Sequence, residues 1–171
     1  LRLAQRTARI EPFRVMELVK RAHALERAGR SIIHLSIGEP DFTAAPSVVG
    51  ALKHAVDAGS TGYTAALGLH ALREAIARHS AQVHGVDIDP ARVVVTAGAS
   101  GALLLACCAL VNPGDQVLMA DPCYPCNRHF VSAFDGVPLT IPVGPETRFQ
   151  LDASHVAAHW GPGGRGVLLA S

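Results

Sequence analysis

The part of the sequence best suited to bind an anion is the run TAGASG at positions 96–101. Three valines precede it and an apolar segment follows, so it predicts a loop between a buried strand and a helix. Small side chains let backbone N–H groups approach a phosphate, and a helix N-terminus adds partial positive charge. The hydroxyl of Ser100 either donates a further hydrogen bond or caps the helix. Taken alone, the run is equally typical of a tight turn that binds nothing.

A tyrosine follows the next predicted strand, within the run DPCYPC at positions 121–126. The carboxyl ends of parallel strands open at one edge of a sheet, so this run and the 96–101 loop are expected to face the same side. The ring of Tyr124 is then placed to cover a flat heterocycle whose phosphate the loop holds. The alternative is a tyrosine that packs on a neighbouring helix.

The same run supports a rival function, because Cys123 and Cys126 have the C-x-x-C spacing of a thioredoxin-like redox pair. Such folds carry the motif after their first strand, whereas more than a hundred residues precede it here. Redox chemistry would need a thiol of low pKa at Cys123. The four cysteines show no disulfide framework, so a reducing cytoplasm is the expected location.

Two further segments carry candidate ligands. Gly38 opens the run GEPDF at 38–42, and its lack of a side chain allows its N–H to meet a substrate carboxylate. The alternative is a turn whose acids are merely solvated. Tyr63, in the run GYT at 62–64, either donates its hydroxyl or packs in the core. The nine histidines are expected to be surface or capping residues, so no metal site is predicted.

The composition excludes several classes of protein. The chain has 171 residues, of which 49% are apolar, and this favours a buried globular core over disorder. The net charge of +1, with no basic cluster, gives no support to a nucleic-acid or anionic-membrane partner. No apolar run reaches the length of a membrane-spanning helix. Because the first residue is Leu1 and not methionine, the true start is expected upstream.

Hydrophobic periodicity predicts the elements that must position these residues. Helices are expected at 11–28, 46–58, 69–84, 100–111, 127–134 and 152–160, and strands or extended segments at 31–37, 93–95, 116–120, 137–143 and 166–170. Apolar strands that alternate with helices predict an α/β fold, a three-layer sandwich with a mostly parallel sheet covered on both faces. The last strand reaches the end of the sequence, and we therefore expect the natural chain to continue.

Taken in order, these segments resemble the class I aminotransferases of fold type I, which depend on pyridoxal 5′-phosphate (PLP). The matching runs are IGEPDF at 37–42, GYT at 62–64, Gly68 with LREAI at 72–76, VVVT at 93–96, GASGAL at 98–103, PGD at 113–115 and DPxYP at 121–125. Each run is weakly specific, but together they cover nearly the whole chain in the family's order. The resemblance implies an N-terminal arm and small-domain segment at 1–44, and an incomplete PLP-binding large domain at 45–171.

The resemblance also implies roles for individual residues. The PLP phosphate would be bound by Gly98, Ala99 and Ser100. Tyr124 would stack on the pyridine ring, and the N–H of Gly38 would bind the substrate α-carboxylate. Tyr63 would reach the phosphate of the neighbouring subunit's cofactor, which implies a homodimer. Ala99 stands where many relatives have glycine, a change of little cost because the backbone N–H makes the contact.

Three residues that the family needs have no match in these 171 residues. In the family a lysine forms the Schiff base with PLP, an aspartate pairs with the pyridinium nitrogen, and an arginine binds the carboxylate. The only lysines, Lys20 and Lys53, precede the phosphate loop, whereas the family's lysine follows it. An Asn-Pro-x-Gly segment is expected almost directly after Ser171. The chain is therefore interpreted as the N-terminal portion of an aminotransferase, with no catalytic residue assigned.

The function implied is transfer of an amino group between an amino acid and a 2-oxo acid. One alternative is another fold type I reaction, such as that of a lyase or decarboxylase, because PLP serves as an electron sink in all of them. A second alternative is a non-catalytic PLP-binding sensor domain of a transcription regulator. A winged-helix segment upstream of Leu1 would favour the regulator.

We expect residues 1–171 alone to show no transaminase turnover, because neither Lys20 nor Lys53 matches the position of the family's catalytic lysine. The measurement is production of a 2-oxo acid from an amino acid in the presence of PLP. The control is the same mixture without protein, and PLP-dependent turnover above that level would contradict the expectation.

Overall fold

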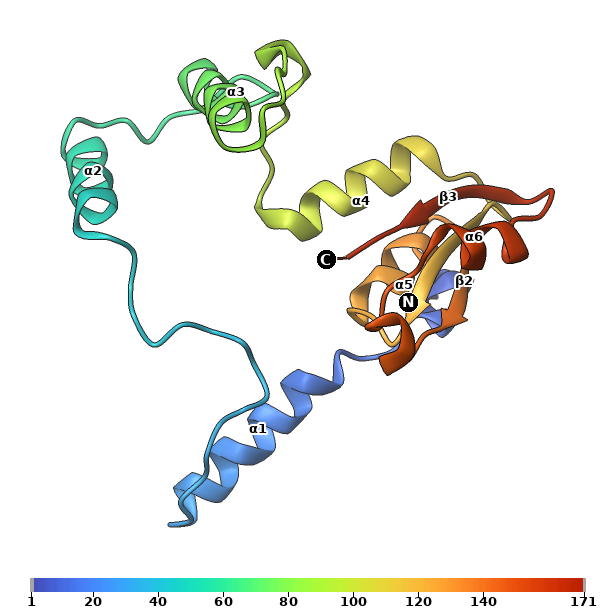
Figure 1. The fold of residues 1–171 in the computed structure, drawn as a ribbon. Helices are drawn as coiled ribbons and strands as arrows, with labels where there is room; N and C mark the ends of the chain where they lie inside the picture. Colours follow the sequence, from blue (N-terminus) through green and yellow to red (C-terminus); the bar gives the residue numbers. More distant parts are fainter. Residues whose placement is uncertain (1, 171) are drawn as a thin grey trace. The chain divides into compact units, whose positions relative to one another are not determined.

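The computed structural model describes residues 2–170, which form two compact units (Figure 1). The first unit combines the chain up to Ser36 with the chain from Leu103 onward, and the second is Ile37–Ala102. The boundary at residue 102 falls within helix α4, Gly98–Leu110. The division at residues 44 and 45 suggested by the family resemblance stays a prediction. Over residues 2–170, no helix is both long and apolar enough to span a membrane.

A parallel sheet of three strands organises the first unit. Its strands are β1 (Gln116–Asp121), β2 (Val137–Pro142) and β3 (Gly164–Leu168), in the order β2-β1-β3. The central strand pairs in parallel with both neighbours. These strands confirm the three predicted around positions 116–120, 137–143 and 166–170, each with its bounds shifted by no more than two residues.

One face of the sheet carries the main hydrophobic core. Met119 points to this face, is fully buried, and clusters with Phe130 and Val131 of α5 (Cys126–Ser132). Cys107 of α4 joins the same cluster. Successive residues of a strand point to opposite faces, so α4 and α5 cover the face of the sheet that Met119 occupies.

Leu118 points to the other face of the sheet and is fully buried. Its partner in register on β3 is Val167. Val167 lines a hollow together with Val156 and Trp160, on and just after α6 (Ala153–His159). Helices therefore cover both faces of the sheet, which confirms the three-layer α/β architecture expected from the sequence.

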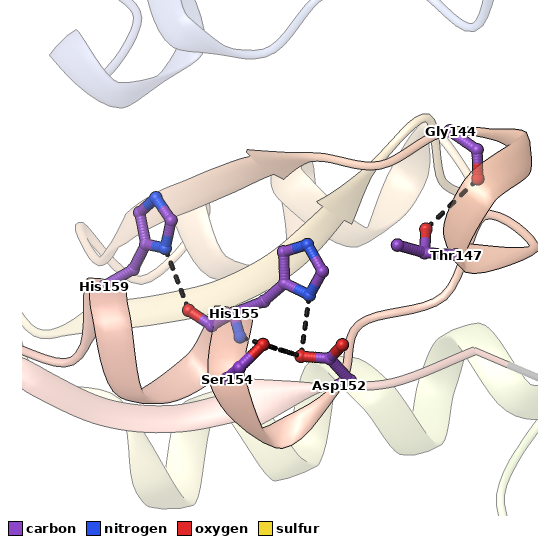
Figure 2. Close-up of polar contacts among 6 residues, drawn as sticks. All are labelled: Gly144, Thr147, Asp152, Ser154, His155 and His159. Carbon is purple, nitrogen blue, oxygen red and sulfur yellow. Dashed lines mark hydrogen bonds and ion pairs between the residues drawn. The ribbon is translucent and has the colours of Figure 1, made fainter.

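Polar contacts fix the start of α6 (Figure 2). The carboxylate of Asp152 accepts hydrogen bonds from the Ser154 hydroxyl at 2.6 Å and from the His155 backbone N–H at 2.9 Å. These bonds, led by the one from Ser154, hold the pKa of Asp152 below its ordinary value. The arrangement is a helix N-cap, which satisfies donors that have no acceptor inside the helix. The short helix η3 (Pro145–Thr147) precedes it.

Within the first unit, ion pairs join the N-terminal segment to the part that follows α5. The short helix η1 (Gln5–Arg9) places Arg6 and Arg9 against the carboxylate of Asp135, just after α5. Arg6 also donates to the Ala133 carbonyl at 3.0 Å. The chain then forms α1 (Arg14–Arg27), which begins three residues later than the sequence predicts.

The second unit contains α2 (Pro46–Asp57), α3 (His70–His84) and the short helix η2 (Pro90–Arg92). Gly68 lies just before α3 with φ of +96°, and an added Cβ would come within 2.7 Å of the Val95 side chain. The backbone conformation and the close approach both require glycine at this position.

Two predicted strands are not strands in the structure. Residues 31–37, expected as a strand or an extended segment, form no strand and bend at Ser36 and Ile37. The predicted strand at 93–95 begins in an extended conformation at Val93 but is unpaired. A strand needs a neighbour to satisfy its backbone, and here Arg73 takes that place by donating to the carbonyls of Val93 (3.0 Å) and Pro90 (2.6 Å). Val95 donates its N–H to the Leu67 carbonyl instead of to a strand. The prediction of a buried strand at 93–95 was therefore wrong, and Val94 is 52% exposed.

The burial of the central strand gives a test of stability. We expect Leu118→Ala to lower the free energy of unfolding by about 2–5 kcal/mol, because it removes a fully buried side chain and leaves a cavity. Urea denaturation followed by circular dichroism measures the loss. The matched control is Leu35→Ala, whose side chain is 90% exposed and whose loss is expected to change stability by about 0.5 kcal/mol or less. Equal effects of the two substitutions would contradict the burial pattern.

Candidate functional site

The predicted phosphate loop forms the first turn of α4. The helix begins at Gly98, two residues earlier than predicted, and Gly98 has φ of +77°. The Thr96 hydroxyl donates to the Gly98 carbonyl at 2.8 Å and so fixes the turn. Ala99 and Ser100 follow in the first helical turn, where backbone N–H groups have no acceptor inside the helix.

The chemistry of this turn suits an anion such as a phosphate group. Gly98, Ala99 and Ser100 are all exposed, and a Cβ added to Gly98 would meet no atom within 4 Å. A phosphate can therefore approach the free N–H groups without displacing a side chain, at the positive end of a thirteen-residue helix. The residues fit the phosphate group of PLP.

Tyr124 lies between the end of β1 and the start of α5, as predicted. Its side chain is 49% exposed, so part of the ring remains open to a ligand. A hydrogen bond with the side chain of Cys126 is the largest cause that raises the pKa of its hydroxyl. The ring of Phe13 meets the Tyr124 ring edge to face, with centroids 6.1 Å apart and planes at 70°.

Phe13 is a contact that sequence reasoning missed. It immediately precedes α1 and is partly buried, and its ring supports the aromatic side chain proposed to stack on a cofactor. No spacing rule indicates such a contact, because the two residues are more than a hundred positions apart. The only clue in the sequence is an aromatic residue at a helix start.

Gly38 and Tyr63 lie on exposed loops of the second unit. Gly38 has open space where a side chain would be, so its N–H is accessible to a ligand. Tyr63 is fully exposed on the loop between α2 and α3. Full exposure contradicts the alternative that Tyr63 packs in the core of the chain. Its contact with a neighbouring subunit stays a prediction.

The structure brings only part of the predicted site together. Gly98, Ala99 and Ser100 share one helical turn of the second unit, whereas Tyr124 belongs to the first unit. The cradle formed by Tyr124 with that turn stays a prediction. Lys20 and Lys53 lie exposed on helices α1 and α2, as predicted, and Lys20 pairs with Glu17 at 2.8 Å.

Comparison with known proteins decides the family. The family model for aminotransferase class I and II matches residues 30–170. The chain belongs to this family. It is 41% identical over 164 residues to the valine–pyruvate aminotransferase of Mycobacterium tuberculosis, covering 96% of this chain and 42% of that protein. It is 30% identical to the aspartate aminotransferase of Geobacillus stearothermophilus, covering 100% of this chain and 44% of that protein.

Solved structures give the same result for the fold of this aminotransferase-family chain. An aminotransferase from Mycobacterium tuberculosis matches with a TM-score of 0.93 and 40% identity, over 100% of this chain and 44% of that one. The aspartate aminotransferase of Thermus thermophilus with maleate matches with a TM-score of 0.92 and 28% identity, over 98% and 44%. The chain thus spans less than half the length of these relatives.

The Cys123 thiol does not have the low pKa that a thioredoxin-like redox function would need. Burial raises the pKa of the Cys123 thiol above its ordinary value and is the largest cause; Asp121 raises it further, while Arg128 lowers it. A thioredoxin-like pair needs the opposite shift at its attacking thiol. The family membership and this direction of shift both argue against redox catalysis at Cys123.

The pKa shift predicts slow chemistry at this thiol. We expect iodoacetamide at pH 8 to alkylate Cys123 more slowly than the exposed Cys108, because a raised pKa lowers the fraction of reactive thiolate at a given pH. The rate at Cys123 should rise as pH increases further. Tandem mass spectrometry of the digested protein measures each rate. In urea, which removes burial, the two rates should converge; faster alkylation of Cys123 at pH 7 would instead support a redox pair.

Proposed function

We propose that the polypeptide containing this chain is a PLP-dependent aminotransferase, which moves an amino group between an amino acid and a 2-oxo acid. The observation that carries the proposal is the exposed, side-chain-poor first turn of α4, in a chain that belongs to the aminotransferase class I and II family. That turn supplies backbone donors and helix-end charge where a phosphate would bind.

The residues of this chain would hold and orient the cofactor. The N–H groups of the first turn of α4 and the Ser100 hydroxyl would bind its phosphate. The ring of Tyr124, held edge-on by Phe13, would stack on the pyridine. When bound, PLP supplies an electron sink for reactions at the amino acid Cα.

The substrate would be oriented by its carboxylate. The N–H of Gly38 is available to donate a hydrogen bond to that carboxylate, because no atom lies within 4 Å of the place a Gly38 side chain would take. A lysine that moves the proton at Cα is not matched within residues 1–171, and we place it in the part of the relatives' length that this chain does not cover.

The relatives suggest which substrates to test first. The relative from Mycobacterium tuberculosis is named a valine–pyruvate aminotransferase, whereas the Geobacillus relative is named an aspartate aminotransferase. We propose valine with pyruvate as the first pair, because the identity is higher with the first of these proteins. We further propose a cytoplasmic homodimer in which the exposed Tyr63 reaches the partner's cofactor phosphate.

The test uses the full-length polypeptide that contains these residues. We expect it to convert pyruvate and valine to alanine and the corresponding 2-oxo acid, and Ser100→Ala to weaken PLP binding about tenfold or more. The reason is that a hydrogen bond to a charged group is worth about 1.5–3 kcal/mol. Equilibrium dialysis with detection of PLP by absorbance measures the affinity, and chromatography of the products measures the transfer.

The matched control is Ser47→Ala, an exposed serine in the first turn of α2, which should leave PLP affinity unchanged. Equal affinities of the Ser100 and Ser47 variants would contradict the proposed phosphate site. PLP binding followed by decarboxylation or elimination, with no amino transfer to any 2-oxo acid, would contradict the proposed reaction.

A further inference from the structure

Helix α1 ends in a turn that folds the chain back beside it (Figure 1). Gly29, with φ of +87°, donates its N–H to the Glu26 carbonyl, and Arg30 donates to the Leu25 carbonyl at 3.1 Å. This left-handed glycine ending reverses the direction of the chain. The returning segment places His34 against the last turns of α1.

Three potential metal ligands meet there. His23 and Glu26 are three residues apart on α1, so they lie on one face of the helix. His34 comes back to join them, with its Nε2 atom 2.6 Å from Glu26 Oε1. The rings of His23 and His34 have centroids 5.5 Å apart. One ligand atom from each of the three residues lies within 4.8 Å of the other two.

We infer that His23, Glu26 and His34 form a surface site for a divalent transition-metal ion, with Zn²⁺ as the reference ion. Two imidazoles and one carboxylate are a ligand set that zinc accepts, with the fourth position open to water. The site lies beyond the prediction from sequence, which expected no metal ligands among the nine histidines.

The geometry needs only small side-chain movements. Tetrahedral zinc with bonds of about 2.0–2.1 Å would hold its ligand atoms about 3.3 Å apart. The present arrangement is close to that value, since Glu26 Oε1 and His34 Nε2 are 2.6 Å apart and the three ligand atoms all lie within 4.8 Å of one another. The side chains of His34 and Glu26 are 39% and 36% exposed, so they are free to adjust and the ion can reach them from solvent.

Binding would tie two segments together. The ion would link the last two turns of α1 to the returning segment, which in the metal-free protein is held near His34 by the contact with Glu26. That segment continues within four residues to Gly38, so the metal would restrict the chain that leads to the proposed carboxylate ligand. The metal site itself does not depend on the proposed aminotransferase function.

Calorimetric titration of the purified chain with ZnCl₂, in a buffer that does not chelate zinc, tests this inference. The parent and all variants carry Cys108→Ser, Cys123→Ser and Cys126→Ser, so that the accessible thiols do not compete for zinc. We expect one bound Zn²⁺ in the parent. We expect His34→Ala and Glu26→Gln each to weaken Zn²⁺ binding at least about tenfold. Removing a residue that only hydrogen-bonds a metal ligand already lowers metal affinity about 10–100-fold, and these substitutions remove a ligand itself. Circular dichroism checks that the exposed substitutions leave the fold intact.

A second histidine pair provides the matched control. His155 and His159 have the i,i+4 spacing of a helical metal pair, and their Nδ1 atoms contact Asp152 and the His155 carbonyl (Figure 2). Among the described residues, however, this pair has no third ligand atom within 4.8 Å of both, as His23, Glu26 and His34 have. The double variant His155→Ala/His159→Ala should bind Zn²⁺ as tightly as the parent. Loss of binding confined to that control, or equal affinity in the parent and in His34→Ala, would overturn the inference. The zinc measurement does not require that the protein bind PLP, so failure of the proposed PLP site is detected separately.

Discussion

The first unit depends on the pairing of one central strand. Strand β1 bonds in parallel to β2 and β3, and Leu118 and Met119 at its middle are fully buried on opposite faces. Because both faces are covered, the strand must be apolar on both sides, and its polar groups must be satisfied by its neighbours. The helices α4, α5 and α6 find their places by packing on this strand and its partners. Tyr124 lies in the loop that follows the carboxyl end of β1.

Helix starts and loops supply the candidate binding residues in this chain. The N-terminus of a helix presents unpaired N–H groups, and these attract anions without any charged side chain. The first turn of α4 illustrates this, since Gly98, Ala99 and Ser100 contribute backbone and one hydroxyl only. Under the proposed function, the remaining groups needed for amino transfer would be side chains outside residues 1–171. When backbone groups bind the phosphate and side chains contact the substrate, proteins of one fold can keep the same phosphate-binding turn while their substrate-contacting residues differ.

The second unit shows how a chain satisfies backbone groups where a strand lacks a partner. Residues 93–95 have the apolar pattern of a buried strand, yet Val94 remains half exposed. Arg73 of α3 bonds the carbonyls of Val93 and Pro90, and Leu67 accepts from Val95. The Arg73 guanidinium suits this role because its fork of donors reaches two carbonyls at once. Gly68 makes room for Val95 beside it.

Local patterns in the sequence determined most elements and the candidate ligands: the helix periods, the three strands of the sheet, and the small-residue turn at Gly98 follow from spacing and residue size. Tertiary structure decided what spacing cannot encode. The pattern at 93–95 predicts burial but not the presence of a pairing strand, so that strand was predicted wrongly. Phe13 contacts Tyr124 only because the fold brings together residues that are far apart in the sequence. His34 meets His23 and Glu26 only because the chain reverses after α1. Both contacts depend on the path of the chain in three dimensions, which residue spacing does not encode.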